Sequence, residues 1–269
     1  MMRRNAAPTL GVDLFPGADL EEVNARAGLQ TRIDSKYLIT PAAYATLVAR
    51  LAEDDDWSVL EINGRRQFQY ISTYFDTPDL LTYRQHRQGR RRRFKIRTRQ
   101  YADTGDCAFE IKLEGAREAT SKQRMPYDRE HAVRLTGEAR LFLEDVLRGA
   151  HRMSPPDRLA PTATTNYLRY TLAQRSGAAR LTFDTGLVCS SPRGRIEALP
   201  LWAVESKSTG DGSGADRLLW SLGVRPLRIS KYCLAIGALT PELAANPWSR
   251  AMRRWFGGGA SERATPVRR

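Results

Sequence analysis

Charged side chains occupy every second position in several short segments of the sequence. Arg93, Lys95, Arg97 and Arg99 alternate in this way with neighbours such as Phe94. In a β-strand, a period of two places such side chains on one face and their neighbours on the other. The pattern recurs at Arg32, Asp34 and Lys36, at Glu110 and Lys112, at Lys122 and Arg124, at Arg169, at Arg180 and Asp184, and at Glu205 and Lys207. Guanidinium and ammonium groups at this density are suited to binding phosphate oxygens.

The balance of charge on these faces constrains what they bind. Twelve of the side chains are basic and four are acidic: Asp34, Glu110, Asp184 and Glu205. Like charges gathered out of water repel one another, so such a set is tolerable only if it is wet or filled by a multivalent anion. The carboxylates would then hold a divalent cation that bridges phosphate oxygens. We also expect that removing Arg97 or Arg180 relieves repulsion and stabilises the empty protein.

Strands and helices must position these faces. Period-two patterns predict strands near residues 29–39, 57–62, 67–76, 91–101, 107–114, 121–128, 165–174, 179–190 and 201–208. Helices are expected from Thr40-Pro41, over 138–149, around 215–222, from about Lys231, and within 241–256. Since apolar helices must cover the apolar strand faces, the charged faces should look into one shared space. We therefore predict an α+β fold, a closed antiparallel β-barrel with helices outside and a charged lumen.

The overall composition agrees with a polyanion-binding protein. The 269 residues carry a net charge of +13, of which residues 84–99 contribute +9 and residues 249–269 contribute +5. No apolar run is long enough for a membrane span, and we expect no signal peptide. The sequence lacks a P-loop and a GxGxxG motif, and its three histidines lack metal-ligand spacing. Cys107, Cys189 and Cys233 indicate buried thiols in a reduced, cytoplasmic compartment.

The order of short motifs resembles one protein family. The motifs are Ser35-Lys36-Tyr37-Leu38, Tyr74-Phe75-Asp76-Thr77, Tyr83-Arg84, the run from Phe94 to Tyr101, Phe109-Glu110-Ile111-Lys112, Tyr167-Leu168-Arg169-Tyr170, Arg180-Leu181-Thr182-Phe183-Asp184, Val204-Glu205-Ser206-Lys207 and Ser230-Lys231-Tyr232. Together they resemble the catalytic domain of the vacuolar transporter chaperone (VTC) family, which belongs to the triphosphate tunnel metalloenzymes. On this basis we expect an N-terminal extension over 1–27, a single VTC-like domain over 28–240, and a basic helix with a disordered tail over 241–269.

The resemblance implies an eight-stranded tunnel and a metal-dependent phosphotransferase, a polyphosphate polymerase that uses ATP. The residues it implies for catalysis and triphosphate binding are Lys36, Arg97, Arg99, Lys112, Arg169, Arg180 and Lys231, with Lys122 and Lys207 along the phosphate path. The charged strand faces add Arg93, Lys95 and Arg124 as phosphate-binding candidates. Glu205 would be the main ligand of Mn²⁺ or Mg²⁺, with Asp34, Glu110 and Asp184 as further candidates. Family members often have Glu where this chain has Asp34, which leaves the role of that residue open.

Three alternatives remain open from the sequence. The same fold with water as acceptor would be a tripolyphosphatase or nucleoside triphosphatase. A nucleic-acid-binding protein would use the run Arg90–Arg93, although we expect no specific nucleic acid as partner. The segment 241–256 has tryptophans on one side and arginines on the other; we expect a helix with one docked face, and its alternative role is peripheral contact with the inner face of an anionic membrane. The oligomeric state stays undetermined.

Overall fold

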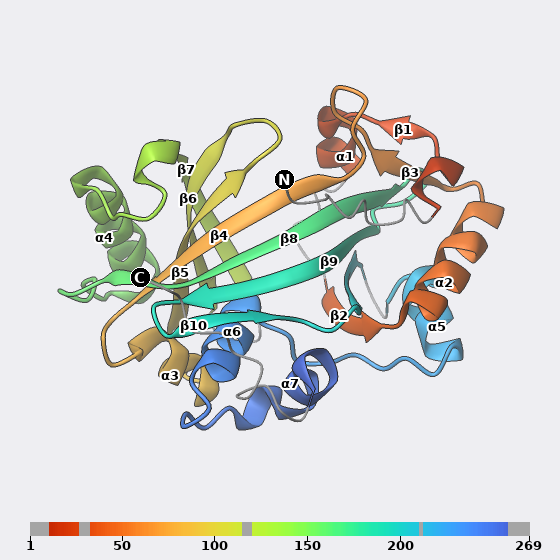
Figure 1. Cartoon of the computed structure of the whole chain (residues 1–269). Coiled ribbons are helices and arrows are strands. Elements are labelled where there is room, and N and C mark those ends of the chain that lie inside the picture. The colour runs from red at the N-terminus through yellow and green to blue at the C-terminus, as the bar shows by residue number, and fades with distance from the viewer. Residues whose placement is uncertain (1–10, 27–32, 115–119, 210–211, 258–269) are drawn as a thin grey trace, which may run out of the picture. The chain divides into compact units, whose positions relative to one another are not determined.

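The computed structural model describes residues 11–26, 33–114, 120–209 and 212–257 (Figure 1). Its strands are β1 (Gly17–Ala18), β2 (Ile33–Ile39), β3 (Trp57–Leu60), β4 (Phe68–Asp76), β5 (Arg93–Tyr101), β6 (Cys107–Glu114), β7 (Thr120–Pro126), β8 (Ala160–Gln174), β9 (Arg180–Ser191), β10 (Gly194–Glu197) and β11 (Trp202–Ser208). Its α-helices are α1 (Leu20–Arg26), α2 (Pro41–Glu53), α3 (Leu81–Arg87), α4 (Gly137–His151), α5 (Gly214–Ser221), α6 (Lys231–Leu239) and α7 (Ser249–Phe256). Short 3-10 helices cover Val12–Leu14, Arg129–His131 and Asn246–Trp248.

The predicted α+β class and the eight-strand path are present, but the expected closure of the barrel is wrong. Along the described residues, neighbouring strands follow the order β2-β11-β9-β8-β4-β5-β6-β7, an open path with β2 and β7 at its ends. Antiparallel pairing joins β11 to both β2 and β9. It also joins β4 to β5, β5 to β6 and β6 to β7. In β7 the successive residues 121–124 are all exposed, on both faces of the strand. A polar strand of this kind is typical of a protected sheet edge, which explains why the path stops there.

The chain forms two compact units. Unit 1 contains Met1–Phe68, Leu168–Thr185 and Pro200–Leu227, and unit 2 contains Gln69–Tyr167, Gly186–Leu199 and Arg228–Arg269. The long strands β8 and β9 contribute one part to each unit. The prediction of a single domain over 28–240 stays a prediction.

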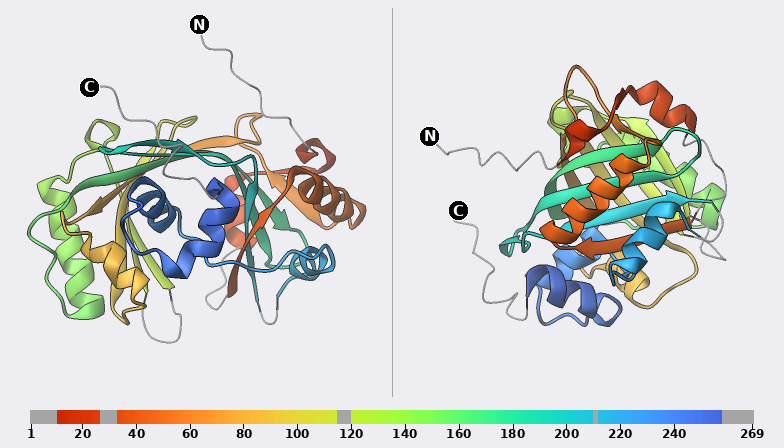
Figure 2. Two further views of the ribbon diagram at one scale, coloured as in Figure 1. Left: turned by 60° about the horizontal axis from the view of Figure 1, so that its bottom comes forward. Right: turned by 90° about the vertical axis from the view of Figure 1, so that its right-hand side faces the viewer.

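Unit 1 has an apolar sheet face covered by α2 and α5 (Figure 2). Its core includes Tyr37 on β2, Phe183 on β9 and Val204 on β11, which pack with Tyr44 and Leu47 of α2. The predicted start of α2 is confirmed, because Thr40 Oγ1 accepts a hydrogen bond from the Ala43 amide at 3.2 Å. The alternating residues of these strands therefore lie on the opposite face of the sheet.

Unit 2 repeats this arrangement with different elements. Phe94 and Ile96 of β5 and Phe109 and Ile111 of β6 pack against α4, which Figure 1 shows beside these strands, through residues that include Leu143. The helix α6 is buried from Tyr232 to Leu239. In α7 and the turn before it, Trp248, Trp255 and Phe256 are buried, so this helix has the docked face that was expected.

The sequence did not predict α3. Its first residues follow Leu80, which adopts a left-handed backbone conformation with φ 58° instead of an ordinary capping conformation. The buried carboxylate of Asp76 takes over the capping: it accepts hydrogen bonds from the amides of Thr82 and Tyr83 at 2.9 and 3.0 Å, and another from the hydroxyl of Tyr232. The cap therefore comes from the end of β4, five residues before the helix.

Two further expectations can be compared with the structure. Cys107, Cys189 and Cys233 are free and buried, as predicted. Among the described residues, no helix combines the length and the apolar character that crossing a membrane requires. Arg32 lies outside the described residues, as does the tail after Gly257. Peripheral membrane association stays a prediction.

Candidate functional site: cationic strand faces in both units

All predicted site residues except Lys231, the first residue of α6, lie on the sheet faces opposite the two apolar cores. They form three clusters, each named after its central carboxylate. The Glu205 cluster of unit 1 consists of Asp34, Lys36, Arg169, Arg180, Asp184, Glu205 and Lys207. The Glu110 cluster of unit 2 consists of Arg97, Arg99, Glu110, Lys122 and Arg124, and the Glu114 cluster consists of His86, Arg93, Lys95, Lys112 and Glu114. That the faces of both units line one lumen stays a prediction.

The centre of the Glu205 cluster is a chain of ion pairs between β2 and β11. Glu205 lies opposite Lys36 in the register, and Lys207 lies opposite Asp34. Lys207 Nζ donates to Glu205 Oε1 and to Asp34 Oδ2, both at 2.8 Å. Lys36 Nζ lies 3.6 Å from the same Glu205 oxygen. Two carboxylates from neighbouring strands thus converge on one cationic atom.

The charge state of Glu205 follows from these neighbours. Burial by itself raises the pKa of the Glu205 carboxyl, but the positive charges of Lys36, Lys207 and Arg169 outweigh burial and hold the pKa well below its usual range. Glu205 is therefore an anion at neutral pH. Its side chain keeps 22% of its surface exposed, so an incoming ion can reach it.

On β8 and β9, Arg169 and Asp184 form a two-point pair. Arg169 donates from Nε to Asp184 Oδ1 at 2.5 Å and from Nη2 to Oδ2 at 2.7 Å, while Asp184 is almost fully buried. Arg180 lies opposite Lys207 in the register of β9 and β11. Asp184, with both oxygens engaged by one guanidinium, is thus a weaker metal-ligand candidate than Glu205.

The Glu110 cluster spans β5, β6 and β7. Arg97, Glu110 and Arg124 are aligned across the three strands. Arg97 donates from Nε and Nη2 to Glu110 Oε2 at 2.7 and 2.5 Å, and Lys122 Nζ lies 3.5 Å from Oε1. Arg99 Nε lies 4.0 Å from Glu110 Oε2. A single buried carboxylate therefore serves three cations, which leaves positive charge in excess.

The pKa values in this cluster reflect that excess. Burial raises the pKa of Glu110, but Arg97, Arg99 and Lys122 outweigh burial and hold it far below its usual value. Burial lowers the pKa of Lys122, and the positive charges of Arg99, Arg97 and Arg124 lower it further against the opposing effect of Glu110. A polyanion that arrives beside Lys122 would stabilise its charged form.

Tyrosine hydroxyls orient the two arginines of this cluster. Arg97 Nη1 donates to the hydroxyl of Tyr74 at 3.2 Å, and Arg99 Nη2 donates to the hydroxyl of Tyr167 at 3.2 Å. Lys231 Nζ lies 4.5 Å from the centre of the Tyr167 ring, a cation–π contact. Tyr74 and Tyr167 are both buried, and their hydroxyl groups hold the guanidinium groups in place.

Two members of the Glu114 cluster, Glu114 and His86, are not among the site residues predicted from the sequence. Glu114 Oε2 lies 2.6 Å from Arg93 Nη2, and its Oε1 lies 3.2 Å from Lys95 Nζ and 3.6 Å from His86 Nε2. Burial raises the pKa of Glu114, but the nearby His86 ring and the positive charges of Lys95 and Lys112 outweigh burial and hold it far below its usual value. Extending the alternation of Glu110 and Lys112 by one step predicts Glu114; no pattern in the sequence points to His86.

The residues in unit 1 fit a divalent cation in one respect. Magnesium in phosphate-transfer sites is usually held by one or two carboxylates together with substrate phosphates. The Glu205 and Asp34 oxygens already converge on the cationic Nζ of Lys207, so they can reach a common cation. Within the described part of the chain, no group of three or more His, Cys, Asp or Glu residues is arranged to hold a metal. A metal there would therefore need oxygens from a bound phosphate or from water.

The arrangement has a clear chemical consequence. Both units present guanidinium and ammonium groups from adjacent strands, and the carboxylates among them are fewer and already paired. Such faces are chemically suited to a flexible anion with several phosphate groups, because donors on neighbouring strands can each contact a different phosphate. No side chain in the three clusters is an activated serine, threonine or cysteine nucleophile.

Comparison with known proteins adds the following. The family model described as VTC domain matches residues 31–240. A candidate adenylate cyclase from Bacillus halodurans is 16% identical with a TM-score of 0.48, over 75% of this chain and 94% of that chain. A candidate adenylate cyclase from Vibrio parahaemolyticus is 15% identical with a TM-score of 0.43, over 77% of this chain and 98% of that chain. A candidate adenylyl cyclase from Hippeastrum is described as having a dominant triphosphatase activity. It is 11% identical with a TM-score of 0.43, over 76% of this chain and 95% of that chain. No curated protein sequence matches.

Proposed function

This chain belongs to the VTC domain family, and on that premise we propose that it is a polyphosphate polymerase, which transfers the γ-phosphoryl group of ATP to the end of an inorganic polyphosphate chain. Membership of the family supports an enzyme that transfers phosphoryl groups or hydrolyses triphosphates. The observation that carries the proposal is the excess of lysine and arginine on the strand faces around Glu205 and Glu110.

In this proposal the protein positions the reactants and neutralises their charge. An oxygen at the end of the chain forms a bond to the γ-phosphorus, the bond from that phosphorus to the bridging oxygen breaks, and ADP leaves with the electron pair. Charge builds up on the phosphoryl oxygens in such a step, and preorganised cations stabilise it. Arg97, Arg99 and Lys122 have geometry suited to this, since Glu110 and two tyrosines already hold the arginines in place.

We assign the same phosphate-binding role to the other basic members of the clusters and to Lys231 of α6. They are Lys36, Arg93, Lys95, Lys112, Arg124, Arg169, Arg180, Lys207 and Lys231. Lys36 and Lys207 lie beside Glu205, so their ammonium groups are near any phosphate that contacts this carboxylate. Lys231 is placed by the ring of Tyr167.

Glu205 and Asp34 would hold the Mn²⁺ or Mg²⁺ ion. When bound, such an ion neutralises charge on the phosphates and fixes their orientation. Lys207 Nζ donates to both carboxylates. Asp34 has a shorter side chain than Glu, yet its Oδ2 is within 2.8 Å of the same Nζ that Glu205 contacts.

Product analysis distinguishes a polymerase from a hydrolase of the same fold. The two activities differ only in the acceptor, a phosphate chain or a water molecule. Purified protein is incubated with ATP and Mn²⁺, and the products are sized on a urea polyacrylamide gel beside an inactive Glu205→Gln control. We expect long polyphosphate in the wild-type lanes alone. Free phosphate without polymer would assign the chain to the tripolyphosphatase or nucleoside triphosphatase class.

A further inference from the structure

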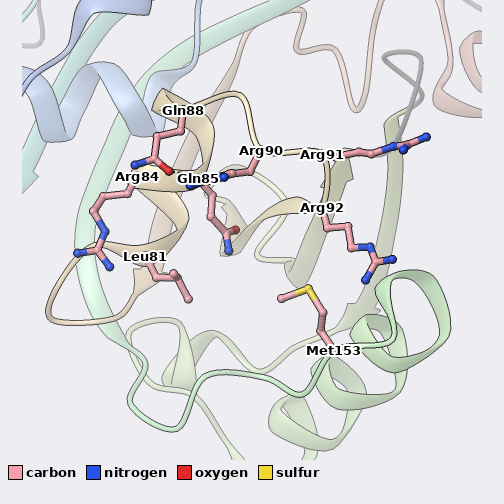
Figure 3. Close-up of a pocket in the computed structure, with 8 residues that line it drawn as sticks. All are labelled: Leu81, Arg84, Gln85, Gln88, Arg90, Arg91, Arg92 and Met153. Carbon is pink, nitrogen blue, oxygen red and sulfur yellow. Dashed lines mark hydrogen bonds between the residues drawn. The ribbon is translucent and has the colours of Figure 1, made fainter.

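A pocket of about 730 Å³ lies in unit 2, and none of its lining residues belongs to the three clusters, although Arg90 accepts a hydrogen bond from Arg93 of the Glu114 cluster (Figure 3). It is lined by Leu81, Arg84, Gln85, Gln88, Arg90, Arg91, Arg92 and Met153. The first four come from α3 and the residue that follows it, the arginines 90–92 from the turn before β5, and Met153 from the segment after α4. We propose that this pocket binds a free nucleotide, with its phosphates on the arginines and its base on the remaining side chains.

The arginines define the anionic part of the ligand. No acidic side chain is among the lining residues. Figure 3 shows Arg84 and Arg92 on either side of the pocket, while Arg91 extends away from it. Arg84 is paired with the exposed Asp79, and Arg90 Nε donates to Gln88 Oε1 at 2.9 Å. Pairs this exposed are weak, so their arginines are readily recruited by a di- or triphosphate group.

The remaining lining residues define the other part of the ligand. Leu81 and Met153 offer a partly buried apolar surface. Gln85 extends into the pocket between them, and its buried Oε1 atom accepts no hydrogen bond from the described residues. An inorganic polyphosphate has neither an N–H donor for this oxygen nor an apolar face for Leu81 and Met153. A purine base has both, through its exocyclic amine and its ring, and guanidinium planes also stack on bases.

Photolabelling tests the proposal in a way that does not depend on catalysis. The full chain is irradiated with 8-azido-ADP in a buffer that contains a metal chelator, and labelled peptides are mapped by mass spectrometry. We expect label in the segment 81–92 or next to Met153. The double variant Arg84→Ala/Arg92→Ala and the separate variant Gln85→Leu should each reduce labelling at least tenfold. Arg129 is an exposed arginine of unit 2 outside the pocket, and the control variant Arg129→Ala should leave the labelling unchanged.

Competition identifies the ligand class. ADP should remove the label, whereas tripolyphosphate at the same concentration should leave most of it. Equal competition by tripolyphosphate would overturn the proposal in favour of a simple phosphate site, and displacement by a single-stranded oligonucleotide at far lower concentration would favour nucleic acid. Absence of label from these residues would overturn it as well. A failure to make polyphosphate would leave these results unaffected, so this site and the proposed function are tested separately.

Discussion

Arg97 donates from two nitrogen atoms to one carboxylate oxygen of Glu110, and Glu110 is only 1% exposed. Each of the two charges therefore depends on the other. Without Arg97, the carboxylate would be left with Lys122 at 3.5 Å and Arg99 at 4.0 Å. This pairing reverses our expectation that removing Arg97 stabilises the empty protein, because the loss of a partner from a buried pair costs more than the relief of repulsion.

We predict that Arg97→Met lowers the free energy of unfolding by about 3 kcal/mol, the usual cost of leaving a buried charge without its partner. Urea unfolding of the protein without ligand measures the change. The double variant Arg97→Met/Glu110→Leu should lose much less, since it removes both charges together. Equal or higher stability of Arg97→Met would show that repulsion dominates in this cluster.

The lowered pKa of Glu110 predicts the pH dependence of stability. The carboxyl is ionised in the folded protein at pH values where the unfolded chain, with a pKa near 4.3, already binds a proton. Lowering the pH from about 5 therefore favours unfolding, until the folded carboxyl itself is protonated. Thermal melts between pH 5 and 3 should show a steeper fall for the wild type than for Glu110→Gln. Parallel curves would contradict the assignment.

We predict that Glu205→Gln abolishes turnover and largely preserves binding of tripolyphosphate. The substitution removes the main candidate metal ligand, while Lys36, Lys207 and Arg169 remain in place. Activity with Mn²⁺ should fall at least about 100-fold, and calorimetric titration with tripolyphosphate should give an affinity close to that of the wild type. Glu144→Gln on the surface of α4 is the matched control. An active Glu205→Gln protein would remove Glu205 from the metal role.

The strand faces should prefer a short linear anion to nucleic acid. Cations from adjacent strands suit a flexible chain of phosphates, whereas a rigid duplex contacts an exposed surface. In a gel-shift assay with labelled duplex DNA, any binding should disappear with added salt and with micromolar tripolyphosphate. The variant Lys36→Ala should weaken tripolyphosphate binding, so that more tripolyphosphate is needed to abolish the shift. DNA binding that resists tripolyphosphate would support the alternative based on Arg90–Arg93.

Much of the fold was predictable because the two faces of the strands differ so strongly. Alternation located β5 and β6, and the cap Thr40-Pro41 located α2. The missed helix α3 is short, and its capping carboxylate, Asp76, belongs to the preceding strand. The prediction that the sheet closes into a barrel was wrong. A charged strand face indicates a polar environment, but it does not indicate which strands form the edges of the sheet.

The site was predictable in its residue types and less so in its pairings. The alternation identified Arg97, Glu110, Glu205 and Lys207, but partners depend on the register between strands that are far apart in sequence. Asp184 on β9, for example, pairs with Arg169 on the neighbouring strand β8. The roles of the tyrosine hydroxyls could not be inferred, because a tyrosine in a strand serves equally well as a packing residue.

The most direct test of the proposed polymerase is a count of phosphate groups. Wild-type protein is supplied with ATP and Mn²⁺, and the phosphate recovered in chains longer than three units is divided by the ADP formed over the same time. A polymerase gives a ratio close to one, because each ADP corresponds to one phosphate added to a chain. A ratio close to zero, with the phosphate recovered as free orthophosphate, would contradict the proposed function.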